Sequence, residues 1–217
     1  MKTAILVDGG FYRKRAKYMW GKKTPQERAD ELFEYCLLHL SSKYDERKLY
    51  RIFYYDCPPL AKSVFHPLLK KNVNFSKLET YQWTIDFFNQ LKRKRKMALR
   101  LGYISDVSIG YDIDKTKLKE LCSGKIKLED LKEGDFNVGF TQKGVDMRIG
   151  LDIASLAYKK QVDQIILISG DSDFVPAAKL ARREGIDFIL DPMGAKIKDD
   201  LFEHIDGLES PRKNQKN

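Results

Sequence analysis

Short apolar runs that end at or just before an aspartate recur along the chain. They cover residues 2–7 (KTAILV), 48–57 (KLYRIFYYDC), 165–168 (IILI) and 186–190 (IDFIL). Each run is short and rich in β-branched or aromatic residues, which predicts a β-strand. Because the run 165–168 has no polar position, it predicts a strand that is buried on both faces.

Between these runs, apolar residues recur at the spacing of an α-helix. The predicted helices cover residues 11–20, 25 to about 40, 81–96, 143–157, 174–181 and 196–205. Thr24 and Pro25 supply a capping residue and a helix-starting proline for the second of them. Alternating strands and helices predict an α/β fold with a doubly wound, mostly parallel sheet and helices on both of its faces.

Other segments have weaker patterns. We expect residues 60–79 to be irregular or weakly helical, and residues 97–104 to form a third strand or a hairpin arm. The charged stretch at about 105–140 predicts an insertion with a small helix at 115–121 and a strand at 136–140 that returns to the core. We therefore expect one domain over residues 1–209, followed by a polar tail, residues 210–217, that is disordered.

Aspartates stand where the predicted strands end. Asp171 and Asp173 follow the strand 165–168, Asp8 follows the first strand, and Asp146 lies in the first turn of a helix, where the helix dipole favours a carboxylate. If the two strands are neighbours, these four carboxylates meet at one crevice of the sheet. Their mutual repulsion is relieved by a cation, and carboxylates without histidine or cysteine suit Mg²⁺ or Mn²⁺. Asp56 and Asp191 share the strand-end position, but a capping or turn role explains each at least as well.

Charge and composition narrow the class of partner. Forty lysines and arginines against 31 acidic residues give a net charge of +9, which favours a polyanion. Three scattered cysteines and three scattered histidines argue against a zinc site. Without a membrane-length apolar run or a signal-peptide pattern, the sequence predicts a cytoplasmic protein with no membrane partner. A homodimer or another protein partner stays open.

Four motifs then carry a resemblance to a known family. They are VDGGF at 7–11, RIFYYD at 51–56, KGVD at 143–146 and ISGDSDFVPAAKLARREG at 168–185. In this order they resemble the NYN domain family, in the LabA-like branch of the PIN-like nucleases. The resemblance implies a PIN-like fold over residues 1–209 and a Mg²⁺- or Mn²⁺-dependent ribonuclease, with RNA, single-stranded rather than duplex, as substrate and DNA as the alternative. By position, the metal-binding and catalytic residues would be Asp8, Asp146, Asp171 and Asp173.

Candidate substrate-binding residues surround these aspartates in the sequence. Tyr12 is expected to stack on a base, and Arg13 and Lys14 to bind phosphates. Ser169 and Ser172 could hydrogen-bond the carboxylates or a phosphate, or only tighten the turn. The basic run Lys92, Arg93, Lys94 and Arg95 could form a phosphate track or a solvated helix end.

Two other classes of function remain open on the sequence alone. One is a non-catalytic RNA-binding or regulatory module that keeps the fold and the metal. The other is a small-molecule phosphatase or phosphotransferase, which is disfavoured because Asp8 is followed by Gly9 and Gly10 and not by a second nearby carboxylate.

Overall fold

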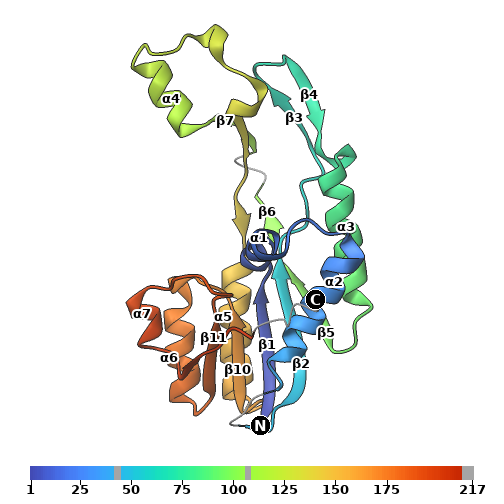
Figure 1. The fold of residues 1–217 in the computed structure, drawn as a ribbon, viewed down its shortest axis with the longest axis vertical. Helices are drawn as coiled ribbons and strands as arrows, with labels where there is room; N and C mark the ends of the chain where they lie inside the picture. Colours follow the sequence, from blue (N-terminus) through green and yellow to red (C-terminus); the bar gives the residue numbers. More distant parts are fainter. Residues whose placement is uncertain (42–44, 106–108, 212–217) are drawn as a thin grey trace.

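A six-stranded parallel sheet forms the centre of the protein in this computed structural model, which describes residues 1–41, 45–105 and 109–211 (Figure 1). From edge to edge its strands are β12 (Gly207–Leu208), β11 (Asp187–Asp191), β10 (Gln164–Ile168), β1 (Lys2–Asp8), β2 (Lys48–Asp56) and β5 (Met97–Leu101). Every neighbouring pair is parallel. The expected pairing of the first strand with the strand at 165–168 is confirmed, because Val7 lies opposite Ile168.

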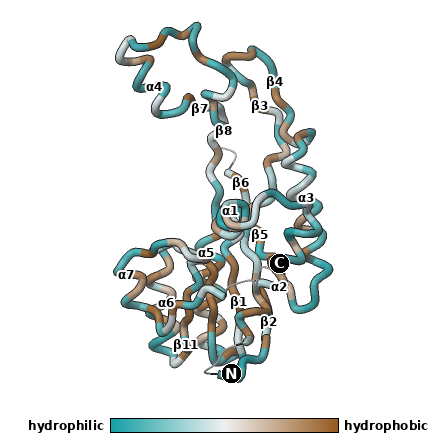
Figure 2. Tube along the Cα trace, viewed as in Figure 1, coloured by the Kyte–Doolittle hydropathy of each residue, from teal (hydrophilic) through white to brown (hydrophobic). Residues whose placement is uncertain are grey.

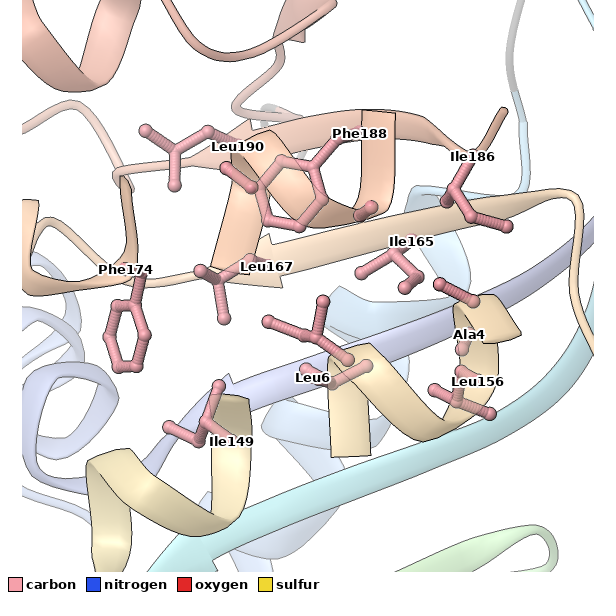
Figure 3. Close-up of a cluster of buried hydrophobic side chains, with 14 of the residues drawn as sticks. Ala4, Leu6, Ile149, Leu156, Ile165, Leu167, Phe174, Ile186, Phe188 and Leu190 are labelled. Atoms are coloured by element: carbon pink, nitrogen blue, oxygen red, sulfur yellow. The ribbon is translucent and has the colours of Figure 1, made fainter. Parts of the chain in front are cut away.

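Helices cover both faces of the sheet, as the sequence predicts. One face carries α1 (Gly9–Trp20), α2 (Pro25–Leu38) and α3 (Glu79–Lys92), and the other carries α5 (Val145–Tyr158), α6 (Val175–Arg183) and α7 (Asp199–Phe202). Side chains alternate along β1, so Ile5 and Val7 pack against the first group of helices while Ala4 and Leu6 pack against the second. Figure 3 shows the second cluster.

The strands that meet at the centre are buried on both faces. All five residues of β10 are buried, which accounts for its uninterrupted apolar run. Thr24 and Pro25 start α2 as predicted, with Thr24 as the N-cap and Pro25 as the first helical residue. The Thr24 hydroxyl accepts a hydrogen bond from the Glu27 amide, and the Glu27 carboxylate accepts one from the Thr24 amide. Figure 2 shows apolar residues concentrated in the sheet strands.

An arm projects from the carboxyl-terminal edge of the sheet (Figure 1). It contains antiparallel pairs and a helix: β3 (Ser63–His66) with β4 (Lys71–Asn74), β6 (Tyr103–Ile104) with β9 (Gln142–Lys143), β7 (Gly110–Ile113) with β8 (Phe136–Gly139), and α4 (Lys115–Cys122). Short 3₁₀ turns lie at Phe75–Lys77, Leu128–Asp130 and Glu133–Asp135. The predicted insertion therefore lies outside the main sheet, and its predicted helix is present.

Several expected elements differ from the structure. Residues 60–79 hold the β3–β4 hairpin where we expected irregular or helical structure. The segment 136–140 pairs with β7 in the arm and does not return to the core. The helix expected over 81–96 ends at Lys92, and the one expected over 196–205 is helical only over Asp199–Phe202.

The polar tail begins with an ordered residue. The Ser210 hydroxyl donates a hydrogen bond to Asp191 Oδ1 at 2.6 Å, so the tail is fixed at its first position. Residues 212–217 of the expected tail, and residues 106–108 of the expected insertion, lie outside the described residues.

Candidate active site

The strand order reverses beside β1. From β1 the chain builds outward through β2 and β5, and it then crosses to β10, β11 and β12 on the other side of β1. The turns that leave β1 and β10 therefore diverge to opposite faces, and ligands of open α/β sheets bind at this kind of position. Asp8 ends β1, and Asp171 and Asp173 lie in the turn after β10.

Asp8 is held by hydrogen bonds to both carboxylate oxygens. As the N-cap of α1, its Oδ1 accepts from the Phe11 amide at 3.1 Å, and its Oδ2 accepts from the Ser169 hydroxyl at 3.2 Å. Burial raises the pKa of Asp8. The two hydrogen bonds oppose part of this rise, and the charges of Asp146 and Asp56 add to it.

The turn after β10 is organised by its own aspartate. Asp171 accepts a hydrogen bond from the Asp173 amide at 3.0 Å, and the Asp171 amide donates to the Ser169 hydroxyl at 3.3 Å. Gly170 is required here, because a Cβ at this position would lie 2.9 Å from the Phe11 ring. Asp171 and Asp173 both remain exposed, so their free oxygens face solvent.

Asp146 connects the two groups electrostatically. It lies in the first turn of α5, after Gly144 in the left-handed conformation with φ of +81°. Burial raises the pKa of Asp146, and the charges of Asp171 and Asp173 raise it further. Since Asp146 also raises the pKa of Asp8, the four aspartates form one group of mutually repelling carboxylates.

These residues match the donor chemistry of a hard cation but are not gathered into a preformed cage. Among residues 1–41, 45–105 and 109–211, no three His, Cys, Asp or Glu side chains are close enough to hold a metal ion together. The donors are all carboxylate oxygens, which suit Mg²⁺ or Mn²⁺. A cation would also relieve the repulsion that raises the pKa of Asp146. The donor set therefore fits such an ion, held partly through water molecules.

The structure removes Tyr12 from the expected substrate-binding set. Its ring is fully buried between α1 and α2, and its hydroxyl donates to Glu31 at 3.3 Å, so the expectation that it stacks on a base is wrong. Ser169 is also buried and orients Asp8. Ser172 accepts a hydrogen bond from Lys198 Nζ at 3.0 Å, which brings a cation next to Asp171 and Asp173.

Arg13 and Lys14 lie on α1, close to Asp8, but in different settings. Arg13 Nη2 lies 3.0 Å from Asp56 Oδ1, and Lys14 is exposed. Asp56 is almost fully buried and also accepts hydrogen bonds from the Tyr54 hydroxyl and the Cys57 amide. The strand-end position of Asp56 is visible in the sequence, whereas its pairing with Arg13 is not.

The basic run Lys92, Arg93, Lys94 and Arg95 lies far from the aspartates. It begins with the last residue of α3 and precedes β5, so it lies toward the amino-terminal edge of the parallel sheet. Lys94 pairs with Asp30 of α2. The structure therefore does not bring this run to the carboxylate group, and the expected phosphate track beside the site is not formed by it.

A second buried carboxylate centre lies at Asp191, for which the sequence favours a capping or turn role at least as much as a place in the site. Its oxygens accept hydrogen bonds from the Tyr35 hydroxyl (2.6 Å), the Met193 amide (2.7 Å) and Ser210, and lie 2.9 Å from His39 Nε2. All of Asp191 is buried, so this centre ties α2 and the carboxyl-terminal segment to β11 and has a structural role.

Comparison with known families supports the sequence-based resemblance. The model of the NYN domain matches residues 74–203, which is more than half of the chain. The chain belongs to the NYN domain family. Its all-parallel sheet between two helical layers agrees with the PIN-like architecture that the sequence predicts for an NYN domain. The matched part of this NYN domain includes Asp146, Asp171 and Asp173, while Asp8 precedes it.

Individual relatives are distant. An uncharacterized protein of Methanocaldococcus jannaschii is 28% identical over 113 residues, which cover 43% of this NYN protein and 47% of the relative. The match thus spans about half the length of that curated relative. The crystal structure of a Vibrio parahaemolyticus protein of unknown function aligns with a TM-score of 0.49 at 15% identity, covering 95% of this chain and 90% of that one. In the described part of this chain, no helix is both long and apolar enough to cross a membrane.

Proposed function

We propose that this NYN domain is a metal-dependent ribonuclease that hydrolyses RNA phosphodiester bonds at Asp8, Asp146, Asp171 and Asp173. The observation that carries the proposal is the mutual electrostatic repulsion of these carboxylates at the reversal of strand order. Like charges held close together without a counter-ion cost stability, so such a group is more typical of a functional site than of a structural one. Membership of the NYN family supports a nuclease reaction.

A bound Mg²⁺ or Mn²⁺ would supply a water of lowered pKa and charge stabilisation at the phosphate. Asp8, Asp146, Asp171 and Asp173 would hold it. The chain itself fixes Asp8 through the Phe11 amide and the Ser169 hydroxyl, so one ligand is oriented before substrate arrives. Lys198, which is bonded to Ser172, would place a positive charge beside the negatively charged phosphodiester.

RNA is the proposed substrate, with single-stranded RNA preferred and DNA as the alternative. The net charge of +9 supports a polyanion. A single strand can bring its scissile phosphate to a site flanked by the projecting arm and α1 more readily than a duplex can.

The test is incubation of the purified protein with labelled single-stranded RNA and DNA in Mg²⁺, Mn²⁺ or EDTA. Asp171→Asn is the informative variant, because an asparagine keeps the acceptor for the Asp173 amide and removes only the charge. Asp163→Asn is the matched control, since Asp163 bonds the Lys2 amide at the amino-terminal edge of the sheet. We expect metal-dependent cleavage by the wild type and the control, and none by Asp171→Asn. Equal cleavage by all three proteins would refute the assignment.

One observation favours a second function, a non-catalytic RNA-binding or regulatory module. Within the described residues, no three potential ligands lie close enough to form a metal cluster. The same experiment discriminates between the two. If the wild type and Asp171→Asn both retain RNA on a gel, and neither cleaves it in Mg²⁺ or Mn²⁺, the result would support the binding module.

A further inference from the structure

A groove with a volume of about 690 Å³ lies between α1 and the first turns of α2 and α3. We call it the α1–α3 groove, and its principal lining residues are Arg13, Lys17, Lys22, Lys23, Thr80 and Trp83. It is an open depression on the helical layer formed by α1, α2 and α3, which lie together in Figure 1. Neither the family match nor the candidate active site assigns it a role.

Basic residues outnumber acidic ones in the lining of the groove, where the acidic residues are Glu27 and Glu79. Glu27 caps α2, Glu79 lies in the first turn of α3, and Lys23 pairs with Glu31. Lys17 and Lys22 are exposed, and among the described residues no carboxylate forms an ion pair with either of them. Two free ammonium groups on one open surface favour an anionic ligand.

An aromatic ring is fixed in the same groove. Trp83 is half-buried, its indole N–H donates to the Lys23 carbonyl at 3.0 Å, and its ring stacks on Phe87 at 5.2 Å with 18° between the planes. Because these contacts hold the indole in place, its groove-facing part can stack on a base without a further loss of side-chain entropy.

Arg13 connects the groove to the aspartates. Arg13 is paired with Asp56, and its buried Nε has no hydrogen-bond partner. Helix α1 begins directly after Asp8, and Lys17 follows Arg13 by one turn on the same side. Lys17 is therefore about 14 Å along α1 from Asp8. The groove leads away from the carboxylates along this helix.

From this arrangement we propose that the α1–α3 groove binds the segment of a single-stranded RNA that extends from the carboxylate group. Lys17, Lys22 and Arg13 contact its phosphates, and one base stacks on Trp83. Free cations that alternate with a fixed ring are the features that single-stranded nucleic acids require. The substrate class rests on the proposed function. The position of the RNA rests on the lining of the groove. The groove takes the place of the phosphate track considered at Lys92 to Arg95.

The test measures binding without cleavage. A labelled 12-nucleotide oligouridylate is titrated in EDTA at several salt concentrations with the wild type and with the double variant Lys17→Glu/Lys22→Glu. The double variant Lys92→Glu/Arg95→Glu is the matched control, because it changes the net charge equally at the other edge of the sheet. We expect the groove variant to bind at least about tenfold more weakly, with a salt slope reduced by about 1.4 for two lost contacts. The control should stay within about twofold of the wild type.

A second measurement reports on Trp83 directly. The chain has two tryptophans, so Trp20→Phe leaves Trp83 as the single tryptophan, whose emission is excited selectively at wavelengths that tyrosine does not absorb. Stacking of a uracil should quench its emission, and Trp83→Phe should lower the affinity by roughly tenfold or less, since a smaller ring still stacks. Three outcomes would each overturn the groove assignment. They are an equal loss of RNA affinity in both double variants, no RNA binding in EDTA, and RNA binding that leaves Trp83 emission unchanged. Groove-dependent binding without any cleavage in Mg²⁺ or Mn²⁺ would instead refute the nuclease alone.

Discussion

Substituting Asp8 by asparagine and by alanine separates its structural role from its proposed metal-binding role. The Asp8 carboxylate caps α1 through the Phe11 amide and accepts from the buried Ser169 hydroxyl. Asparagine can keep both contacts, because its carbonyl accepts from Phe11 and its amide can donate to Ser169. Alanine loses both. If the capping role were the whole function of Asp8, asparagine would be an adequate replacement.

The magnitudes follow from these contacts. Loss of an N-cap costs about 1 kcal/mol, and loss of the partner of a buried hydroxyl costs about 1 kcal/mol more. Asp8→Ala should therefore lower the free energy of unfolding by about 2 kcal/mol, or lower Tm by roughly 4–8 °C for a chain of this size. Asp8→Asn should lower it by much less, because asparagine is as good an N-cap as aspartate.

The pH dependence has a definite sign. Burial raises the pKa of Asp8 above its ordinary value of 3.8, so the folded protein disfavours the ionised form. The part of the stability that comes from protonation of Asp8 is therefore complete below pH 3.8 and is lost as the pH rises through the folded-state pKa, while the contacts with Phe11 and Ser169 remain. Asparagine does not ionise, so the stability of Asp8→Asn relative to the wild type should increase as the pH rises from about 4 to 7 in EDTA.

Thermal unfolding followed by circular dichroism, in EDTA and in MgCl₂ or MnCl₂, measures all three effects. An ion at ten times its Kd adds about 1.4 kcal/mol to a protein that binds it only when folded. We expect this gain for the wild type, about 3–6 °C in Tm, and a much smaller one for Asp8→Asn. A metal-induced shift of equal size in both proteins would contradict the assignment of Asp8 as a ligand, and an Asn variant as unstable as the Ala variant would contradict the capping argument.

Three further predictions test the fold and the corrected site. Asp191→Ala should lower the free energy of unfolding by about 3–5 kcal/mol in urea, because several buried donors lose their acceptor. Gly9→Ala should destabilise by about 1–3 kcal/mol, since its Cβ would lie 2.5 Å from the Tyr55 carbonyl oxygen, whereas Gly10→Ala, with 3.5 Å to its nearest neighbour, should change stability by less than about 1 kcal/mol. Tyr12→Leu, which removes the aromatic ring, should leave the RNA affinity of the folded protein, measured by the same titration, within about twofold of the wild type, because the ring is buried; a larger loss would restore Tyr12 to the substrate-binding set.

The fold was largely predictable because its signals are local. Each central strand is a short apolar run, and the run at 165–168 has the uninterrupted burial that a parallel central strand requires. The β3–β4 hairpin was missed because its strands have only four residues each and β4 has a single apolar residue, Val73. Alternation over so short a length is too weak to distinguish a strand from a loop.

The candidate site residues that follow β-strands could be predicted from the sequence. Asp8 and Asp171 lie after neighbouring parallel strands, so the sheet itself brings them to one edge. Partners from other elements leave no local signal: Arg13 meets Asp56 across 43 residues. The position of the Lys92 run, in contrast, could have been anticipated, since a segment between a helix and the next parallel strand lies at the amino-terminal edge.

The central position of β1 also affects when the site can form during synthesis. Asp8 is made well before its partner Ser169, which is 161 residues further along the chain. Until β10 has left the ribosome, β1 lacks its neighbour on one side and the four aspartates belong to two unconnected pieces. Non-local pairing of this kind is slow, and it completes only after most of the chain is available. A nascent chain therefore lacks an assembled carboxylate group until β10 is available, and acquires one only when β1 and β10 pair in the sheet.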